Sequence, residues 1–176
     1  MLTIDEPVRR QRLVELGLFR GLRRSSLERI AAACSEVEVD AGRELCRAGE
    51  PAREFVIVLE GAASVSVNGH ETHRLGAGSS FGEIGLVDGY EHPTTVTARS
   101  PMRLLTFSGD EFIELLHTEP EFASRVLAMV AGRLRMLMSE VSEWADPDER
   151  SPSRVPRSAH SDGEGSDGRE VATEST

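Results

Sequence analysis

The feature that most constrains the fold is a series of short apolar segments between residues 35 and 107, separated by glycines. Some segments alternate apolar and polar residues, and others are brief apolar runs such as the one from Phe55 to Leu59. Both patterns, when bounded by glycines, are typical of β-strands joined by turns. Many short strands at regular spacing predict an all-β barrel or sandwich.

One hairpin is specified within this region. Asn68 and Gly69 lie between two alternating segments. Both residue types tolerate positive φ, which a two-residue hairpin turn requires. We therefore expect the chain to reverse direction at Asn68–Gly69 and to continue as an antiparallel strand.

Helical patterns flank the predicted barrel. Before it, apolar residues broken by Gly17 and Gly21 indicate two or three short helices. After it, a segment that begins near Gly109 predicts one helix, and Pro120 marks the first turn of a longer one. The expected divisions are a helical lead-in (1–34), a β-barrel (35–108), C-terminal helices (109–145) and a disordered acidic tail (146–176).

The longer helix carries apolar residues at spacings of three and four, which places them on one face. This stripe consists of Phe122, Val126, Met129, Val130, Leu134, Leu137, Val141 and Trp144. Such a face packs either on the barrel of its own chain or on a second copy of the helix. A homodimer through residues 120–144 is therefore one hypothesis.

The charge balance narrows the choice of partners. The chain has 30 acidic and 20 basic residues, a formal charge of −10, and every basic residue is arginine, as GC-rich bacterial genomes favour. Binding to DNA or to an anionic membrane needs a concentrated patch of positive charge on the protein, so we expect neither as a partner of this acidic chain. No apolar run is long enough to span a membrane or to act as a signal peptide, and two cysteines are too few for a disulfide framework. We expect a cytoplasmic protein.

The segment 76–89 interrupts the strand pattern and carries the candidate chemistry. It is rich in small residues and has a glycine directly before a short helix-like turn. Backbone N–H groups at such a start converge on one point and favour an anion such as phosphate. Glu83 adds an acceptor beside it, which suits a ligand that also presents a hydroxyl, as a ribose does. A plain barrel corner with a solvated Glu83 is the alternative interpretation.

This segment resembles the phosphate-binding cassette of the cyclic nucleotide-binding domain family, in the run FGEIGL from Phe81 and in TVTA at 95–98. Catabolite-activator-type regulators, protein kinase A regulatory subunits and gated channels belong to that family. Residues 17–22, 49–61 and 104–107 extend the resemblance to about 12–143. It implies an eight-stranded jelly-roll-like barrel with flanking helices, no enzymatic activity, no cofactor, and cyclic AMP or cyclic GMP as ligand.

Carried over residue by residue, the resemblance implies contacts to the nucleotide. Gly82 and the backbone of Ile84 and Gly85 would contact the cyclic phosphate, and Glu83 would accept the ribose 2′-hydroxyl. Leu86 would pack beneath the cassette. We count Phe81, which opens the cassette, among the ligand-binding candidates as well.

The sequence departs from the family pattern at the arginine that pairs with the phosphate. His92 aligns with that position, and residues 75–98 contain no arginine. The lost charged hydrogen bond is worth roughly 1.5–3 kcal/mol, so binding is expected to be about 10–100-fold weaker. His92 is expected to replace that arginine in part, and to do so better at acidic pH, where the imidazole becomes charged. Thr94 and Thr95 offer hydroxyls to the phosphate or to a purine edge, although β-propensity explains them equally.

These observations predict a stand-alone regulatory sensor that binds a cyclic purine nucleotide weakly, moves its C-terminal helices and signals to an unidentified effector protein. The alternative is a degenerate member of the family that acts as an interaction module without a ligand. A transcription factor is disfavoured, because no DNA-binding domain follows residue 144. A cupin-like metal site is also disfavoured, because His70 and His73 point to opposite faces of a regular strand and do not converge with Glu83.

Overall fold

A computed structural model describes the backbone of residues 6–144 and the side chains of residues 11–139. The helices are α1 (Glu6–Glu15), the 3-10 helix η1 (Gly17–Phe19), α2 (Arg24–Ala33), α3 (Glu83–Asp88), α4 (Gly109–Thr118) and α5 (Pro120–Trp144). The strands are β1 (Ser35–Val39), β2 (Glu44–Cys46), β3 (Glu54–Glu60), β4 (Ala63–Val67), β5 (His70–Leu75), β6 (Ser80–Phe81), β7 (Thr95–Ala98) and β8 (Met102–Ser108). The predicted disordered tail, 146–176, lies outside the described residues.

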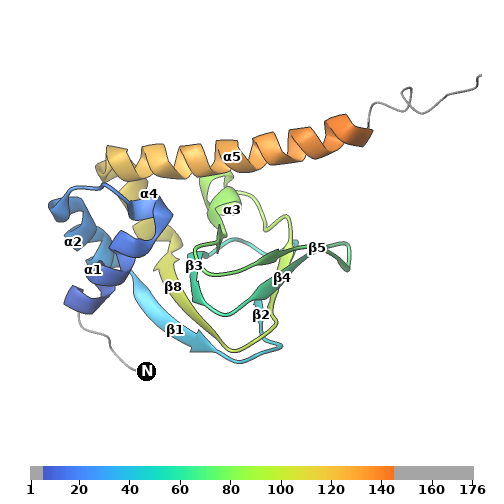
Figure 1. Cartoon of the computed structure of the whole chain (residues 1–176), viewed down its shortest axis with the longest axis horizontal. Coiled ribbons are helices and arrows are strands. Elements are labelled where there is room, and N and C mark those ends of the chain that lie inside the picture. The colour runs from blue at the N-terminus through green and yellow to red at the C-terminus, as the bar shows by residue number, and fades with distance from the viewer. Residues whose placement is uncertain (1–5, 145–176) are drawn as a thin grey trace, which may run out of the picture. The chain divides into compact units, whose positions relative to one another are not determined.

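The strands form two four-stranded antiparallel sheets, in the orders β1-β8-β3-β6 and β2-β7-β4-β5. Helices lie at both ends of this β-region in the sequence, and α1, α2 and α4 gather beside β1 and β8 (Figure 1). The prediction of a mainly β, eight-stranded fold with flanking helices is therefore confirmed for the described part of the chain.

The β4–β5 turn is the predicted hairpin. Asn68 has a φ of 51° and Gly69 a φ of 80°, and Val67 pairs directly with His70 across the turn. Two consecutive residues with positive φ match the twist of antiparallel strands. The predicted hairpin is confirmed, because asparagine and glycine both tolerate the positive φ that the turn needs.

Strand β3 is buried on both faces, which explains its unbroken apolar run. Phe55 and Ile57 pack in a core cluster with the helices, whereas Val56 and Val58 pack in a second cluster between the sheets. Neighbouring side chains of a strand point to opposite faces, so a strand between two cores needs apolar residues throughout. Its neighbour β8 divides its apolar side chains between the same two clusters.

Four phenylalanines join the β-sheet to the helices. The ring centroid of Phe55 in β3 lies 4.5 Å from that of Phe112 in α4, with the rings tilted, and Phe112 meets Phe122 of α5 edge-on at a centroid distance of 6.0 Å. Phe122 in turn lies 5.8 Å from Phe19 of η1. All four side chains are fully buried. Aromatic contacts of this geometry add to the free energy of burying the rings, so this cluster fixes the helices on the sheet.

The junction between α4 and α5 is also held by charge pairs to α2 and the residue before it. Glu119, which is 3% exposed, pairs with Arg29, and Glu121 pairs with Arg23 at 2.9 Å. At the other end of α4, Ser108 and Glu111 form a capping box, and the Gly109 N–H donates to the Arg53 carbonyl at 2.7 Å. Helix α4 is therefore fixed at both ends.

Along α5 the apolar stripe has two parts. Phe122 and Val126 are buried against the helical core, and Met129 is partly buried there. Leu134 and Leu137 are 56% and 59% exposed. The chain separates into two compact units after Leu137, and the first unit contains α5 up to that residue. Packing on the chain's own core accounts for the first half of the predicted stripe.

Gly82 links β6 to α3 in a conformation that only glycine adopts without strain. Its φ is 94°, and a Cβ atom there would overlap the carbonyl oxygen of Glu54 on the adjacent strand. Gly78 has a similar φ of 83°, but a Cβ added there would meet no atom within 4 Å. Substituting alanine at each of the two glycines therefore separates the cost of backbone strain, which both share, from the cost of steric overlap, which only residue 82 has.

We predict that Gly82→Ala destabilises the fold more than Gly78→Ala. Left-handed backbone strain costs each variant about 1–2 kcal/mol of unfolding free energy. Overlap with Glu54 costs Gly82→Ala roughly 1–3 kcal/mol more. Urea denaturation followed by circular dichroism measures both. Equal losses in the two variants would show that the backbone around Gly82 relaxes to admit a methyl group.

Candidate functional site

The first part of the cassette comprises β6, Gly82 and the six-residue helix α3. Left-handed glycines begin and end α3, with Gly82 as N-cap and Gly89 as C-cap. In the middle, Gly85 is buried, and a Cβ there would lie 2.7 Å from both Ala52 Cβ and the Tyr90 carbonyl oxygen. Residue 85 must therefore be glycine for α3 to dock on the loop at 51–53. This close approach places α3 against the start of β3.

Glu83 is the first residue of α3, and its side chain is 1% exposed. Helix α5 passes beside α3 (Figure 1). Arg133 of α5 donates through Nη1 to Glu83 Oε1 and through Nη2 to the backbone carbonyl of Ser80. The same Nη2 lies 3.1 Å from the Ser80 hydroxyl. One arginine therefore joins α5 to both ends of the β6–α3 corner.

The second carboxylate oxygen of Glu83 has no such partner. Oε2 is buried and makes no hydrogen bond to any described residue. Burial raises the pKa of the Glu83 carboxyl above its usual value, and the charge of Arg133 opposes that rise. A buried acceptor without a donor is costly, so Oε2 is a place where a hydroxyl donor would bind favourably.

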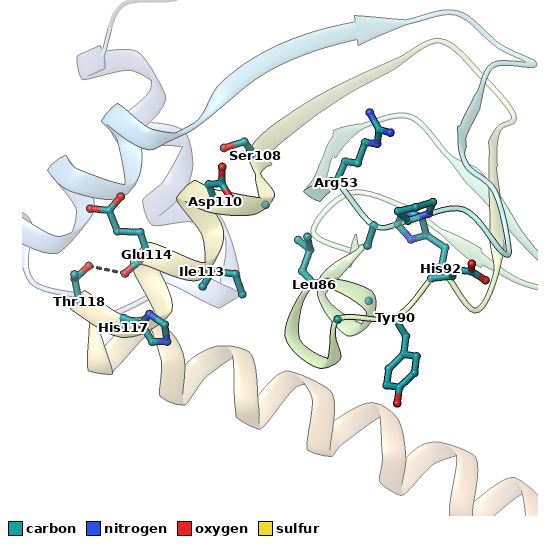
Figure 2. Close-up of a pocket in the computed structure, with 16 residues that line it drawn as sticks. Arg53, Leu86, Tyr90, His92, Ser108, Asp110, Ile113, Glu114, His117 and Thr118 are labelled. Atoms are coloured by element: carbon teal, nitrogen blue, oxygen red, sulfur yellow. Dashed lines mark hydrogen bonds between the residues drawn. The ribbon is translucent and has the colours of Figure 1, made fainter.

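Two open cavities lie beside the cassette. The larger, of about 1640 Å³, lies between α3, α4 and the loop at 89–92, and the smaller, of about 570 Å³, reaches Val56 and Phe81. Pro51, Arg53, His92 and Ser108 line both cavities. In Figure 2 the side chains of Arg53 and His92 lie on the same side of the larger cavity. An arginine and a histidine therefore share one cavity wall.

His92 is held in place by its backbone. Its N–H donates to the Glu50 carbonyl at 2.9 Å, and its carbonyl accepts from the Gly49 N–H at 3.0 Å. The half-buried imidazole has its pKa lowered by burial, an effect that the Glu50 carboxylate opposes. His92 is therefore neutral at physiological pH, where it offers one donor and one acceptor.

The other sequence-predicted residues divide into three groups. Phe81 lines the smaller cavity, and Gly85 and Leu86 line the larger. Gly82 shapes the turn itself, and Ile84 is 45% exposed. Thr94 and Thr95 line neither cavity; the Thr95 hydroxyl accepts from the Ala48 N–H at 3.0 Å, and the Thr94 carbonyl lies 3.7 Å from the Cys46 sulfur. The Thr95 hydroxyl therefore bonds β7 to the segment that follows β2.

Two arginines at the site were missed from the sequence. Arg133 falls on the inward stripe of α5, at a spacing of four from Met129 and seven from Val126, where an apolar residue would be expected. An arginine in an apolar stripe is a usable signal for a buried partner. Arg53 comes from a loop before β3 and lies 39 positions from His92 in the sequence, so no local pattern predicts their meeting.

The described residues hold no group of three or more His, Cys, Asp or Glu side chains suited to a metal ion. His70 and His73 are both exposed on β5, whereas Glu83 is buried beneath α5. Burial raises the pKa of the Cys46 thiol to about 11, so this thiol is neutral at physiological pH. None of the helices in the described range is long and apolar enough to cross a membrane.

Some known proteins are similar to this chain in sequence, and some solved structures are similar to it in fold. A cyclic nucleotide-gated potassium channel of Rhizobium etli is 33% identical over 128 residues, which cover 69% of this chain and 36% of the channel. The chain thus spans about a third of the length of such channel relatives.

Two solved structures share the fold at low sequence identity. The catabolite activator protein of Thermus thermophilus has a TM-score of 0.65 at 22% identity, over 73% of this chain and 62% of that one. The regulatory subunit of a cAMP-independent protein kinase A from Trypanosoma brucei has a TM-score of 0.63 at 22% identity, over 72% of this chain and 47% of that one.

The family match covers the β-region described above. Residues 36–119 match the family model for the cyclic nucleotide-binding domain, from β1 to the residue that follows α4. This segment contains the Gly82 turn, the buried Glu83 and the cavity-lining His92. Residues 36–119 are therefore a cyclic nucleotide-binding domain.

Proposed function

We propose that this domain binds a cyclic purine nucleotide at the 81–98 cassette and acts as a regulatory module without catalytic activity. The observation that carries the proposal is Glu83 Oε2, a buried acceptor that lacks a donor at the position where the family binds a ribose hydroxyl. A ribose 2′-hydroxyl supplies that donor. The match to the family model over residues 36–119 supports the same assignment.

The phosphate end of the ligand would meet the first turn of α3. The N–H groups of Ile84 and Gly85 lie in that turn, where amides have no acceptor within the helix. His92 and Arg53 line the adjacent cavities and bring one neutral imidazole and one guanidinium. Since neither is the cassette arginine of the family pattern, we propose weak binding, reduced about 10–100-fold by the lost charged hydrogen bond.

The signal would travel through the two helices that the cassette contacts. Leu86 of α3 packs so closely on the start of α4 that a Cβ on Gly109 would lie 2.9 Å from its Cδ2. Arg133 connects the other side of the cassette to α5. Ordering of α3 by a nucleotide therefore bears on both helices, and an effector protein that recognises their position would receive the signal.

A second candidate function is an interaction module that binds no nucleotide. It is favoured by the absence of arginine from residues 75–98 and by the burial of Glu83 beneath α5. The Trypanosoma brucei chain of this fold is the regulatory subunit of a cAMP-independent protein kinase A, so the fold is compatible with a regulatory role that cyclic AMP does not control.

The binding proposal predicts a measurable gain from His92→Arg. Calorimetric titration with cyclic AMP and with cyclic GMP would show weak binding by the parent and about 10–100-fold tighter binding by His92→Arg. Because burial lowers the pKa of His92 from 6.5, the parent gains charge, and with it affinity, only as the pH falls below 6.5, whereas His92→Arg keeps its charge throughout. Titrations at about pH 5.5 and about pH 7.5 separate the two behaviours.

His117→Arg is the matched control, because His117 lines the larger cavity from α4 without a place in the cassette. It is expected to leave affinity unchanged. Absence of heat at millimolar nucleotide in both the parent and His92→Arg would reject the binding proposal and favour the interaction module.

We also propose self-association through the exposed part of α5. Leu127 and Leu134 are 70% and 56% exposed and lie seven residues apart, with Val130 and Leu137 three residues after each. This is the a/d spacing at which two helices pair. The pair would bury an apolar seam that the domain's own core leaves uncovered.

Self-association predicts a dimer in sedimentation velocity that Leu134→Glu dissociates. A charge in the seam would face its own copy, so the dimer dissociation constant is expected to rise by at least about tenfold. Val87→Glu, at a 60% exposed position of α3, is the control and should leave the dimer intact. A monomer at every concentration of the parent would contradict the proposal.

A further inference from the structure

Arg53, in the loop before β3, lines both cavities beside the cassette (Figure 2). No other arginine of the described residues lines either cavity, and the chain contains no lysine. His92 lines both cavities as well, but burial lowers its pKa from 6.5, so the imidazole is neutral at physiological pH. Among the described residues, Arg53 is therefore the side chain of these two linings that carries a permanent positive charge.

The guanidinium of Arg53 is available to a ligand. The side chain is exposed, and it takes part in no ion pair with a described residue. Two other exposed arginines are already paired, Arg47 with Glu44 at 2.7 Å and Arg74 with Glu71 at 2.8 Å. A guanidinium without a carboxylate partner gives up no ion pair when an anion binds to it.

The backbone that carries Arg53 is fixed beside the cassette. The Arg53 carbonyl accepts from the Gly109 N–H at 2.7 Å, at the start of α4. The next residue, Glu54, has the carbonyl oxygen that a Cβ on Gly82 would overlap. Arg53 is therefore held one residue away from the strand contact of the cassette glycine, and its side chain is the part that adjusts to a ligand.

The other formal charges around the smaller cavity are negative. Glu50 and Glu54 line that cavity together with His92, and both glutamates are exposed. A carboxylate near a phosphate opposes its binding, because like charges repel. Without Arg53, a phosphate in this cavity would face two carboxylates and a neutral imidazole. Arg53 is thus the favourable electrostatic partner that this cavity offers an anion.

We propose that Arg53 pairs with the nucleotide phosphate and so supplies, from the loop before β3, the positive charge that residues 75–98 lack. The proposal rests on the nucleotide-binding function proposed above. Because Arg53 is exposed, water weakens the pair, which recovers only part of the affinity that a buried charged bond gives. Recognition of the phosphate charge then depends on residue 53, whereas recognition of the ribose depends on Glu83.

The first test compares cyclic AMP with adenosine, which has the same base and sugar but no phosphate. In calorimetric titrations, Arg53→Gln is expected to bind cyclic AMP about 3–30-fold more weakly than the parent and to bind adenosine equally well. Arg43→Gln is the matched control, because it removes the same charge from an exposed residue that lines neither cavity. An equal loss for both ligands, or no loss for cyclic AMP, would overturn the pairing.

The second test uses the salt dependence of cyclic AMP binding. Raising KCl from about 50 mM to about 500 mM screens an exposed ion pair. The affinity of the parent and of Arg43→Gln should fall over this range, and that of Arg53→Gln should fall clearly less. Arg53→Lys keeps the charge and should retain the salt dependence of the parent. The same salt dependence in the parent and in Arg53→Gln would reject the ion pair.

The outcomes separate the role of Arg53 from the binding function. If the parent and Arg53→Gln bind cyclic AMP with equal affinity, nucleotide binding stands and the phosphate pair is rejected. If neither the parent nor His92→Arg binds cyclic AMP or cyclic GMP, the binding function is rejected and the pair with it. Thermal unfolding followed by circular dichroism should be the same for Arg53→Gln and the parent, because the side chain is exposed, so a lost affinity does not report a lost fold.

Discussion

The double-sided burial of β3 is the constraint on which the rest of the structure depends. Phe55 and Ile57 bind the helical layer to the sheet, while Val56 and Val58 fill the space between the two sheets. A single strand thus contributes side chains to both hydrophobic cores. The cassette is built directly on this strand, because β6 pairs with it and Gly82 abuts its first residue, Glu54. The site is therefore built against a strand whose residues 55–58 are buried.

Burial also gives Glu83 its chemical character. The carboxylate lies out of solvent at the start of a short helix, with one oxygen bonded to Arg133 and the other without a donor. A buried charge is tolerated only with a partner, and here the partner comes from α5, 50 residues away in the sequence. The charge of the cassette carboxylate and the position of α5 therefore depend on the same ion pair.

Much of the fold was predictable because its determinants are local. The positive φ angles at Asn68 and Gly69 depend only on those two residue types. The unbroken apolar run at 55–59 by itself predicts a strand that is buried on both faces. The cassette was also found, because the small residues around Gly82 are contiguous. Thr94 and Thr95 were proposed from their hydroxyls; in the structure the Thr95 hydroxyl accepts from the Ala48 N–H, and the Thr94 backbone carbonyl accepts from the Cys46 thiol. Hydroxyl orientation depends on which neighbour the strand pairing supplies, and the sequence does not state that.

By itself, the sequence determined the strand-rich core, the flanking helices, the cassette with its family resemblance, and the absence of an arginine from residues 75–98. Only the tertiary structure decided that Glu83 is buried, that Arg133 bonds its carboxylate, and that Arg53 and His92 line the same cavities. The physical reason is that turns and periodicity follow from neighbours in the chain. Pairing of a buried charge depends instead on which distant side chain the packing of two helices and a strand brings within hydrogen-bond distance.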